Sequence, residues 1–321
     1  MTADRTYRRQ LRELRMVRQR RQSALSLTET MLSVSLCMPL VLGATNLLCQ
    51  SIAEQALSHQ RLLMEQNTQF ALNAIARVVE LAGHNDPLSA TPRLAEPRLR
   101  GWDDATLAAR TDIASGKSGP GLSGSDVLIV NFMSSATATA HALNCAGIPV
   151  PLAGASTVGK AAEGQGYSVF YVARGPDGES ELRCKYRTVT GWDSEALVQR
   201  VESFQVLYGL DRDADGQPDQ FLRAGAISDE ISLGASGASL WNQVVALKIA
   251  LLMCGTQRLQ QVAVPTRWDL FGAEYSALYA KDDRGTMLTS DNFPAHRRHR
   301  LRRSYEQLIF LRNPARGAAL G

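Results

Sequence analysis

The segment from residue 25 to residue 49 constrains the chain most, because it is apolar along its whole length and holds one charged side chain. It reads L-S-L-T-E-T-M-L-S-V-S-L-C-M-P-L-V-L-G-A-T-N-L-L-C. A helix of about 20–25 such residues crosses the roughly 30 Å hydrocarbon core of a bilayer. The charge belongs to Glu29, and an ionised carboxylate at that depth is costly unless a partner lies beside it. The sequence therefore predicts a membrane-spanning helix over residues 25–48 in which Glu29 needs a partner.

The first 24 residues form a strongly basic leader. They contain eight Arg against Asp4 and Glu13, which is more positive charge than the +4 of the whole chain. A cluster of Arg directly before an apolar helix holds that end in the cytoplasm. Because the basic charge is concentrated in the leader, the remainder is slightly acidic, which argues against nucleic-acid binding by bulk charge.

The start of the chain resembles the N-terminus of type IV pilins and pseudopilins, which carry a basic leader, a small residue, an apolar helix and a Glu at mature position five. Here the small residue is Ala24, the mature chain would begin at Leu25, and Glu29 is its fifth residue. The usual Gly and Phe on the two sides of the cut are replaced by Ala and Leu. The resemblance implies cleavage by a prepilin peptidase, N-terminal methylation, and pairing of Glu29 with the N-terminal amine of a neighbouring subunit.

Beyond residue 49 the pattern becomes amphipathic. Apolar residues recur at spacings of three, four or seven, which places them on one face of a helix; they are Ile52, Ala56, Leu63, Phe70, Ala74, Val78 and Leu81. Gly83 and Pro87 then give a C-terminal stop signal. The sequence predicts one helix from Leu25 to Ala82, whose second part, residues 49–83, packs on a sheet.

The remainder, residues 84–321, is predicted to form a β-rich domain with a flexible loop at about 101–125. Short runs rich in Val, Ile, Leu, Phe and Tyr are separated by Gly, Pro and Asp clusters. The predicted strands are Asp126–Phe132, Ser168–Ala173, Leu182–Thr188, Val198–Leu207, Val244–Cys254 and Gln307–Leu311. Strands without regular helices between them indicate an antiparallel sheet. The expected fold class is α+β, with the long N-terminal helix packed on this sheet.

Four segments resemble PilW-type minor pilins in particular. They are F-A-L-N-A-I-A-R-V-V-E-L-A-G-H at residues 70–84, S-F-Q-V-L-Y-G-L-D at 203–211, W-N-Q-V-V-A-L-K-I-A-L-L at 241–252 and Y-E-Q-L-I-F-L-R-N at 305–313. The resemblance implies a minor pilin that assembles through its N-terminal helix and helps to initiate or cap the fibre. Implied partners are other minor and major pilins, the prepilin peptidase and the assembly platform. The implied location is the bacterial inner membrane, with a periplasmic C-terminal domain, and then the fibre.

The segment D-R-D-A-D-G-Q-P-D at residues 211–219 is a candidate calcium loop. Calcium binds six to eight hard oxygen ligands, and loops of this kind supply them from alternate positions, with Gly at position six. The candidate ligands are Asp211, Asp213, Asp215, the carbonyl of Gln217, and Asp219. The twelfth position is a leucine in place of the usual bidentate Glu. An Asp/Gly turn between strands is the alternative interpretation.

Three cysteines lie in the predicted periplasmic domain, where disulfides are permitted. We favour a Cys145–Cys184 bond, but Cys254 is an equal contender, since the sequence does not determine connectivity. No metal-binding Cys spacing and no catalytic motif occurs in the chain, so an enzyme is not expected. The basic cluster at residues 297–303 is more typical of a solvated face than of a DNA-binding site.

Two alternative functions stay open from the sequence. A type II secretion pseudopilin shares the leader, the apolar helix and Glu29. A membrane-anchored periplasmic module that binds calcium or another ligand would use residues 25–48 only as an anchor, and the charge of Glu29 would then be incidental. A cleaved secretory signal fits less well, because its apolar region spans only about 7–15 residues.

Overall fold

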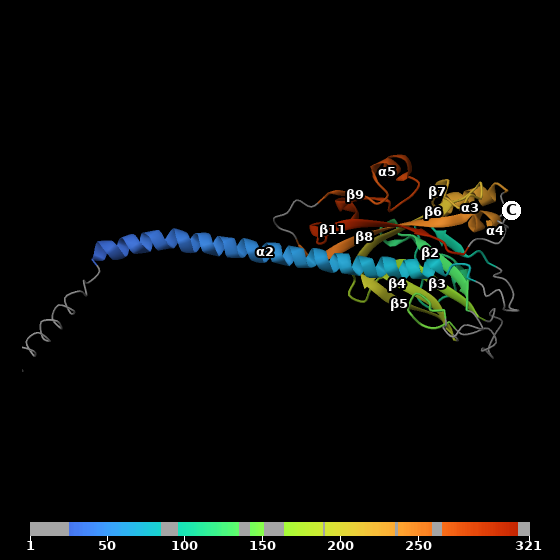
Figure 1. The fold of residues 1–321 in the computed structure, drawn as a ribbon, viewed down its shortest axis with the longest axis horizontal. Coiled ribbons are helices and arrows are strands. Elements are labelled where there is room, and N and C mark those ends of the chain that lie inside the picture. Colours follow the sequence, from blue (N-terminus) through green and yellow to red (C-terminus); the bar gives the residue numbers. More distant parts are fainter. Residues whose placement is uncertain are drawn as a thin grey trace, which may run out of the picture. The chain divides into compact units, whose positions relative to one another are not determined.

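The computed structural model describes residues 26–84, 96–134, 142–150, 164–188, 190–234, 237–258 and 265–313. The leader, with the processing residues Ala24 and Leu25, lies outside the described residues. The chain divides into two compact units, residues 1–59 and 60–321. Helix α2 (Leu27–Glu80) contributes its first part to one unit and its second part to the other (Figure 1). A long N-terminal helix followed by an antiparallel β-domain is an α+β fold, as the sequence predicts.

In the first unit, α2 is long and apolar enough to cross a membrane. Its large apolar side chains between Leu27 and Ile52 are exposed. Pro39 lies inside the helix without ending it. The helix begins two residues after the predicted start and ends two residues before the predicted end, at Glu80.

The second unit is built on two antiparallel sheets. The first has the order β1-β2-β3-β4-β5, with strands β1 (Leu99–Trp102), β2 (Val127–Met133), β3 (Gln165–Arg174), β4 (Ser180–Thr188) and β5 (Gly191–Gln199). The second has the order β11-β8-β6-β7, with strands β6 (Val201–Leu210), β7 (Gln220–Leu222), β8 (Val244–Arg258) and β11 (Arg300–Phe310). The first sheet is a meander, whereas the second brings together strands that are far apart in sequence.

Smaller elements connect and cover these sheets. Strands β9 (Arg267–Asp269) and β10 (Met287–Thr289) form a two-stranded sheet. The short helices are α3 (Ala224–Ser232), α4 (Gly237–Asn242) and α5 (Ala273–Tyr279), and the 3-10 turns are η1 (Ile113–Ser115), η2 (Leu122–Gly124) and η3 (Ser290–Asn292). The helices α3 and α4 between β7 and β8, and α5 between β9 and β10, are absent from the sequence prediction.

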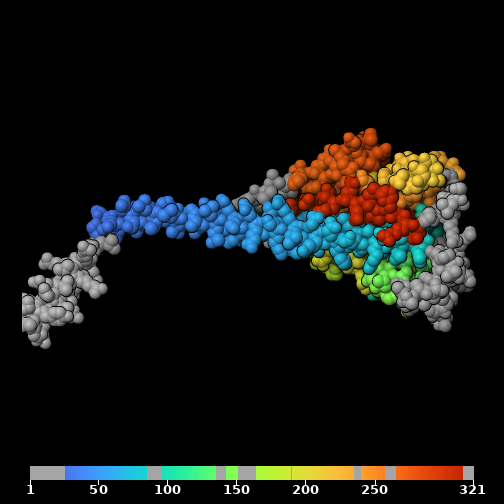
Figure 2. Space-filling model, viewed as in Figure 1, coloured from blue at the N-terminus to red at the C-terminus, as the bar shows by residue number. Residues whose placement is uncertain are grey.

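The second part of α2 packs against both sheets and supplies one wall of the main core. Its buried positions follow helical spacing and are Met64, Thr68, Ala71, Leu72, Ile75, Val78 and Val79. The apolar residues among them share one cluster with Phe170 of the first sheet and Phe204 of the second. Figure 2 shows β11 beside this part of α2, and Arg312 just after β11 forms an ion pair with Glu80.

The apolar stripe that the sequence favours is buried only in part: Val78 is buried and Leu81 packs against the core. Leu63 and Phe70, which the apolar stripe places inside, are 44% and 58% exposed. Apolar residues lie on more than one face of this segment, and the sheets bury the face that contains Leu72 and Ile75. Hydrophobic periodicity identifies a helix, but it does not select between two apolar faces.

The segment at about 101–125 also differs from the expected flexible loop. Ala105, Leu107 and Ile113 are buried against the outer face of the first sheet, in a cluster with Val127 and Tyr171. The Gly and Ser residues that suggest flexibility lie between these apolar anchors, which fix the segment on the sheet.

Helix packing can be tested with two Leu→Ala substitutions on α2. Leu72 is 4% exposed and Leu62 is 54% exposed. We expect Leu72→Ala to lower the free energy of unfolding by about 2–5 kcal/mol, because it leaves a cavity, and Leu62→Ala to change it by about 0.5 kcal/mol or less. Tryptophan fluorescence of the detergent-solubilised protein reports domain unfolding, since Trp102, Trp192, Trp241 and Trp268 all lie in the second unit. Equal effects of both substitutions would contradict this packing.

Candidate functional site

Glu29 lies in the first turn of α2 and is the only Asp, Glu, Lys or Arg between Leu27 and Ala53. Its backbone N–H donates to the Ser26 hydroxyl at 3.3 Å, which is the usual N-cap interaction. Within the part of the chain that the structure describes, no side chain pairs with the Glu29 carboxylate. The carboxylate is therefore available to a group from another molecule.

Several hydroxyl groups of this part of the helix are satisfied by the helix itself. Four hydroxyls donate to backbone carbonyls three or four residues earlier: Thr30 to Leu27 at 2.8 Å, Ser33 to Glu29 at 2.7 Å, Ser35 to Leu32 at 2.8 Å and Thr45 to Leu42 at 3.0 Å. Such bonds let Ser and Thr enter an apolar environment without another partner. The Glu29 carboxylate thus differs from these hydroxyl groups in needing a partner from outside the helix.

The acidic loop lies between β6 and β7. Carboxylate oxygens of Asp211, Asp213 and Asp215 lie within 4.8 Å of one another. Asp211 accepts from the backbone N–H groups of Ala214 at 2.6 Å and Gly216 at 2.9 Å, and both of those residues have positive φ. The loop thus folds around the Asp211 carboxylate.

The remaining two candidate ligands are placed differently. Asp219 accepts from the backbone N–H of Arg212 at 2.7 Å, and the Gln217 N–H donates to Asp215 at 2.7 Å. The loop is tethered to α3 because the Arg212 guanidinium pairs with Glu230 at 2.8 Å. The structure therefore groups three of the five candidate ligands. Calcium binding stays a hypothesis, since Asx-type turns explain the same hydrogen bonds.

Among the cysteines of the domain, Cys145 and Cys184 form a disulfide with a Cα–Cα distance of 5.7 Å. The bond joins the segment 142–150 to β4. Cys254 on β8 is a free, buried thiol, and burial raises its pKa to about 12. A thiol with so high a pKa is mostly protonated and unreactive at neutral pH.

The basic cluster at residues 297–303 is largely an internal ion-pair network, and the prediction of a solvated face is wrong for three of its arginines. Arg302 is 3% exposed and forms a bidentate pair with Glu202 of β6. Arg297 and Arg300 both pair with Glu179, at 3.4 Å and 2.9 Å. Each of these three guanidinium groups therefore forms an ion pair within the domain.

Glu179 and Glu202 were not identified from the sequence as partners of this cluster. Both lie about 100 residues or more from the arginines that they bind. The available signal is that a charged residue inside a largely apolar strand requires a partner, and Glu202 is the one charged residue of β6.

Residues 169–313 match the family model described as Type IV Pilus-assembly protein W, which is a little under half of the chain. The match supports a type IV pilus-associated protein. It runs from β3 to the residues after β11, and so includes the acidic loop and most of both sheets. Searches of curated proteins and of solved structures found no match.

Three of the segments that resemble PilW-type proteins lie inside this match and are neighbours in space. Residues 203–211, 241–252 and 305–313 contain most of β6, β8 and β11, and these strands lie side by side in the order β11-β8-β6. The fourth segment, residues 70–84, is the buried end of α2 and lies outside the match. The resemblance in the matched region is therefore concentrated in one sheet.

The calcium hypothesis predicts stabilisation of the domain by added calcium. A ligand present at 100 times its Kd stabilises a protein by about 2.7 kcal/mol. We expect calcium to raise the thermal midpoint of the detergent-solubilised protein, and Asp213→Ala to abolish this shift. Asp282→Ala, which removes an exposed carboxylate outside the loop, should retain it. No shift in the unsubstituted protein would exclude a calcium site.

The disulfide predicts a specific alkylation pattern for protein produced in an oxidising compartment. In denaturant without reductant, iodoacetamide should modify the three free cysteines, Cys37, Cys49 and Cys254. After reduction, Cys145 and Cys184 should react as well. Peptide mapping that finds alkylated Cys184 before reduction would contradict the bond.

Proposed function

We propose that this protein is a minor pilin that assembles into the type IV pilus through the first part of α2. The observation that carries the proposal is the unpartnered Glu29 carboxylate at the start of an exposed apolar helix. The family match over residues 169–313 supports the same function, because it concerns the globular domain and is independent of Glu29.

In the proposed mechanism, a prepilin peptidase cleaves after Ala24, and Leu25 becomes the methylated N-terminus. The new amine of one subunit then lies beside Glu29 of its neighbour in the fibre. Pairing the two charges removes the penalty of holding either one alone in an apolar environment. The apolar side chains that surround Glu29 on α2 pack against the helices of other pilins.

Before assembly, we propose that α2 spans the inner membrane and the β-domain lies in the periplasm. The Arg-rich leader favours this orientation through the positive-inside rule. The other minor pilins, the major pilin and the assembly platform are the proposed partners, and initiation or capping of the fibre is the proposed role. Adhesion and twitching motility would depend on that fibre. Separately, calcium would bind the carboxylates of the acidic loop and stabilise its conformation.

A type II secretion pseudopilin would use the same helix and the same Glu29. The family match favours the pilus, because the description of the matching model names pilus assembly. A membrane-anchored binding module would need neither cleavage nor Glu29.

The proposal predicts that Glu29→Ala abolishes incorporation of the protein into pili while cleavage after Ala24 continues. Glu29→Gln should fail as well, because the amide has similar size but cannot neutralise an amine. Glu54→Ala removes an exposed carboxylate from the same helix and should leave incorporation unchanged. Immunoblots of sheared pili measure incorporation, and the N-terminal residue and intact mass of the membrane-extracted protein measure cleavage.

Two results would contradict the proposal. One is normal incorporation of Glu29→Ala into pili. The other is a mature protein that retains residues 1–24, which would favour the anchored module instead.

A further inference from the structure

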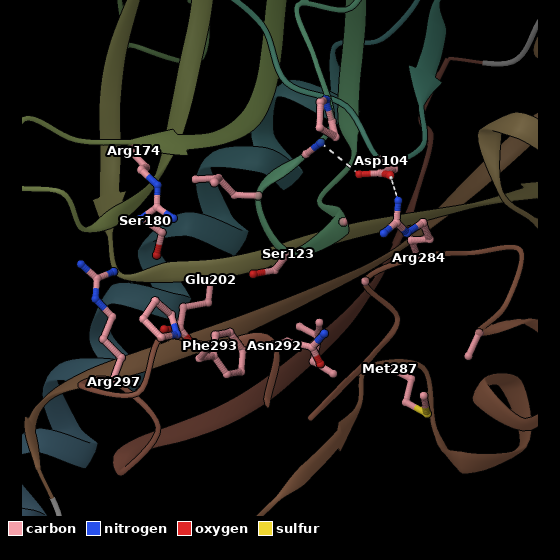
Figure 3. Close-up of a pocket in the computed structure, with 18 residues that line it drawn as sticks. Asp104, Ser123, Arg174, Ser180, Glu202, Arg284, Met287, Asn292, Phe293 and Arg297 are labelled. Carbon is pink, nitrogen blue, oxygen red and sulfur yellow. Dashed lines mark hydrogen bonds and ion pairs between the residues drawn. The ribbon is translucent and has the colours of Figure 1, made fainter. Parts of the chain in front are cut away.

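A cavity of about 500 Å³ lies in the second unit and plays no part in the proposed assembly through α2. Five separate segments line it: Asp104, residues 120–124 around η2, the hairpin of β3 and β4, the start of β6, and residues 280–297 (Figure 3). The volume falls within the range of small-molecule sites, which combine apolar walls with a few convergent polar groups. Its apolar walls include Leu122, Met287 and Phe293.

The charged groups around the cavity leave an excess of positive charge. Three arginines line it, Arg174 from the hairpin of β3 and β4 and Arg284 and Arg297 from residues 280–297, against Asp104 and Glu202. Arg284 pairs with Asp104 at 3.3 Å, and Figure 3 shows this pair away from Arg174 and Arg297.

The second acid, Glu202, is already neutralised by a residue outside the cavity lining. Both of its oxygens accept hydrogen bonds from the buried Arg302. Among the described residues, Arg174 therefore faces the cavity without a carboxylate to balance it, whereas Arg297 pairs with Glu179 outside the lining. Arg297 is held in place by the Gly178 carbonyl at 2.8 Å and by Glu179 at 3.4 Å.

The hydroxyl of Ser180 is the feature that points to a ligand. Ser180 is 7% exposed, and among the described residues its Oγ has no hydrogen-bond partner. It is the first residue of β4 and stands opposite Arg174 of β3 in the ladder. Figure 3 shows its hydroxyl in the cavity between Arg174 and Arg297. A buried hydroxyl without a partner costs about 1–3 kcal/mol, and a bound acceptor would remove that penalty.

The Arg174 guanidinium has N–H donors beyond the one that it uses within the protein. Its side chain is exposed, and it donates to the Gly178 carbonyl at 3.3 Å through Nη1. A guanidinium group presents five N–H donors in a planar fork that matches the two oxygens of a carboxylate. The neighbouring hydroxyl of Ser180 can donate to the same acceptor.

We propose that this cavity binds a ligand through a carboxylate group, which Arg174, Ser180 and Arg297 hold while an apolar part of the ligand contacts Leu122 and Phe293. Carboxylates of this kind occur at peptide C-termini and in acidic sugars. The site is independent of the pilin proposal, since it uses no residue of α2.

Binding can be measured by isothermal titration of the detergent-solubilised full chain with four probes. One is the acetylated tripeptide Gly-Ala-Leu with a free C-terminus, and its C-terminal amide is the matched control. Glucuronate tests an acidic sugar, and inorganic phosphate tests any anion. We expect one or both carboxylates to bind at least tenfold more tightly than the peptide amide and phosphate. Binding of the peptide alone identifies a peptide terminus as the source of the carboxylate, and binding of glucuronate alone identifies a sugar.

Variants locate the binding to the cavity. Arg174→Gln should weaken carboxylate binding at least tenfold, and Ser180→Ala should weaken it about threefold to tenfold, the usual range for one hydrogen bond. Arg110→Gln removes an exposed arginine outside the cavity lining and should have no effect. Thermal midpoints of all variants establish that they are folded. The proposal is wrong if neither carboxylate binds, if phosphate binds equally well, or if Arg174→Gln binds like the unsubstituted protein.

Discussion

The second part of α2 is the packing element on which the domain depends, because both sheets bury side chains against it. Its end is fixed by hydrogen bonds as well as by packing. The Asn313 side-chain amide donates to the carbonyls of Glu80 at 3.2 Å and Ala82 at 3.0 Å, and the Gly83 N–H donates to Asn131 of β2 at 2.9 Å. The last carbonyls of a helix lack partners within it. Here Asn313, which follows β11, supplies hydrogen-bond donors to carbonyls at the helix end, so this end is connected to both sheets.

Strand prediction succeeded where a strand contains a run rich in apolar and aromatic residues and failed where it does not. Strands β2, β3, β4, β6, β8 and β11 each overlap a predicted run. Strand β5 was missed because it is an edge strand in which only Ser194 and Val198 are buried. The chain passes from β5 to β6 at Arg200, which has a φ of 64°. Gly or Asn is the usual residue in that conformation, so the sequence gives no turn signal there and the prediction joined Val198 to β6.

The polar core illustrates why some functional features depend on the fold. Arg302 is buried between Glu202 and the ring of Phe293, which lies 3.9 Å from the guanidinium carbon. In the sequence, Arg302 belongs to a run of basic residues that looks solvated, because its partner is 100 positions away. The same limit applies to the cavity, whose walls come from five segments. Glu29, in contrast, can be identified from the sequence alone, because it is a single charged residue within one continuous apolar segment.

The two units therefore differ in how far their functional residues can be recognised in the sequence. In the first part of α2, four hydroxyl groups donate to carbonyls of the same helix and so need no other partner. Glu29 is the one charged side chain between Leu27 and Ala53, and its carboxylate does need one. The N-terminal end of a helix favours a negative charge, which suits Glu29 in its first turn. Any apolar environment that encloses this segment, whether lipid or a bundle of similar helices, must then supply a cation or a hydrogen-bond donor at one defined height along the helix. A lone charge of this kind sets the register between neighbouring helices, because apolar packing alone permits many registers of similar free energy.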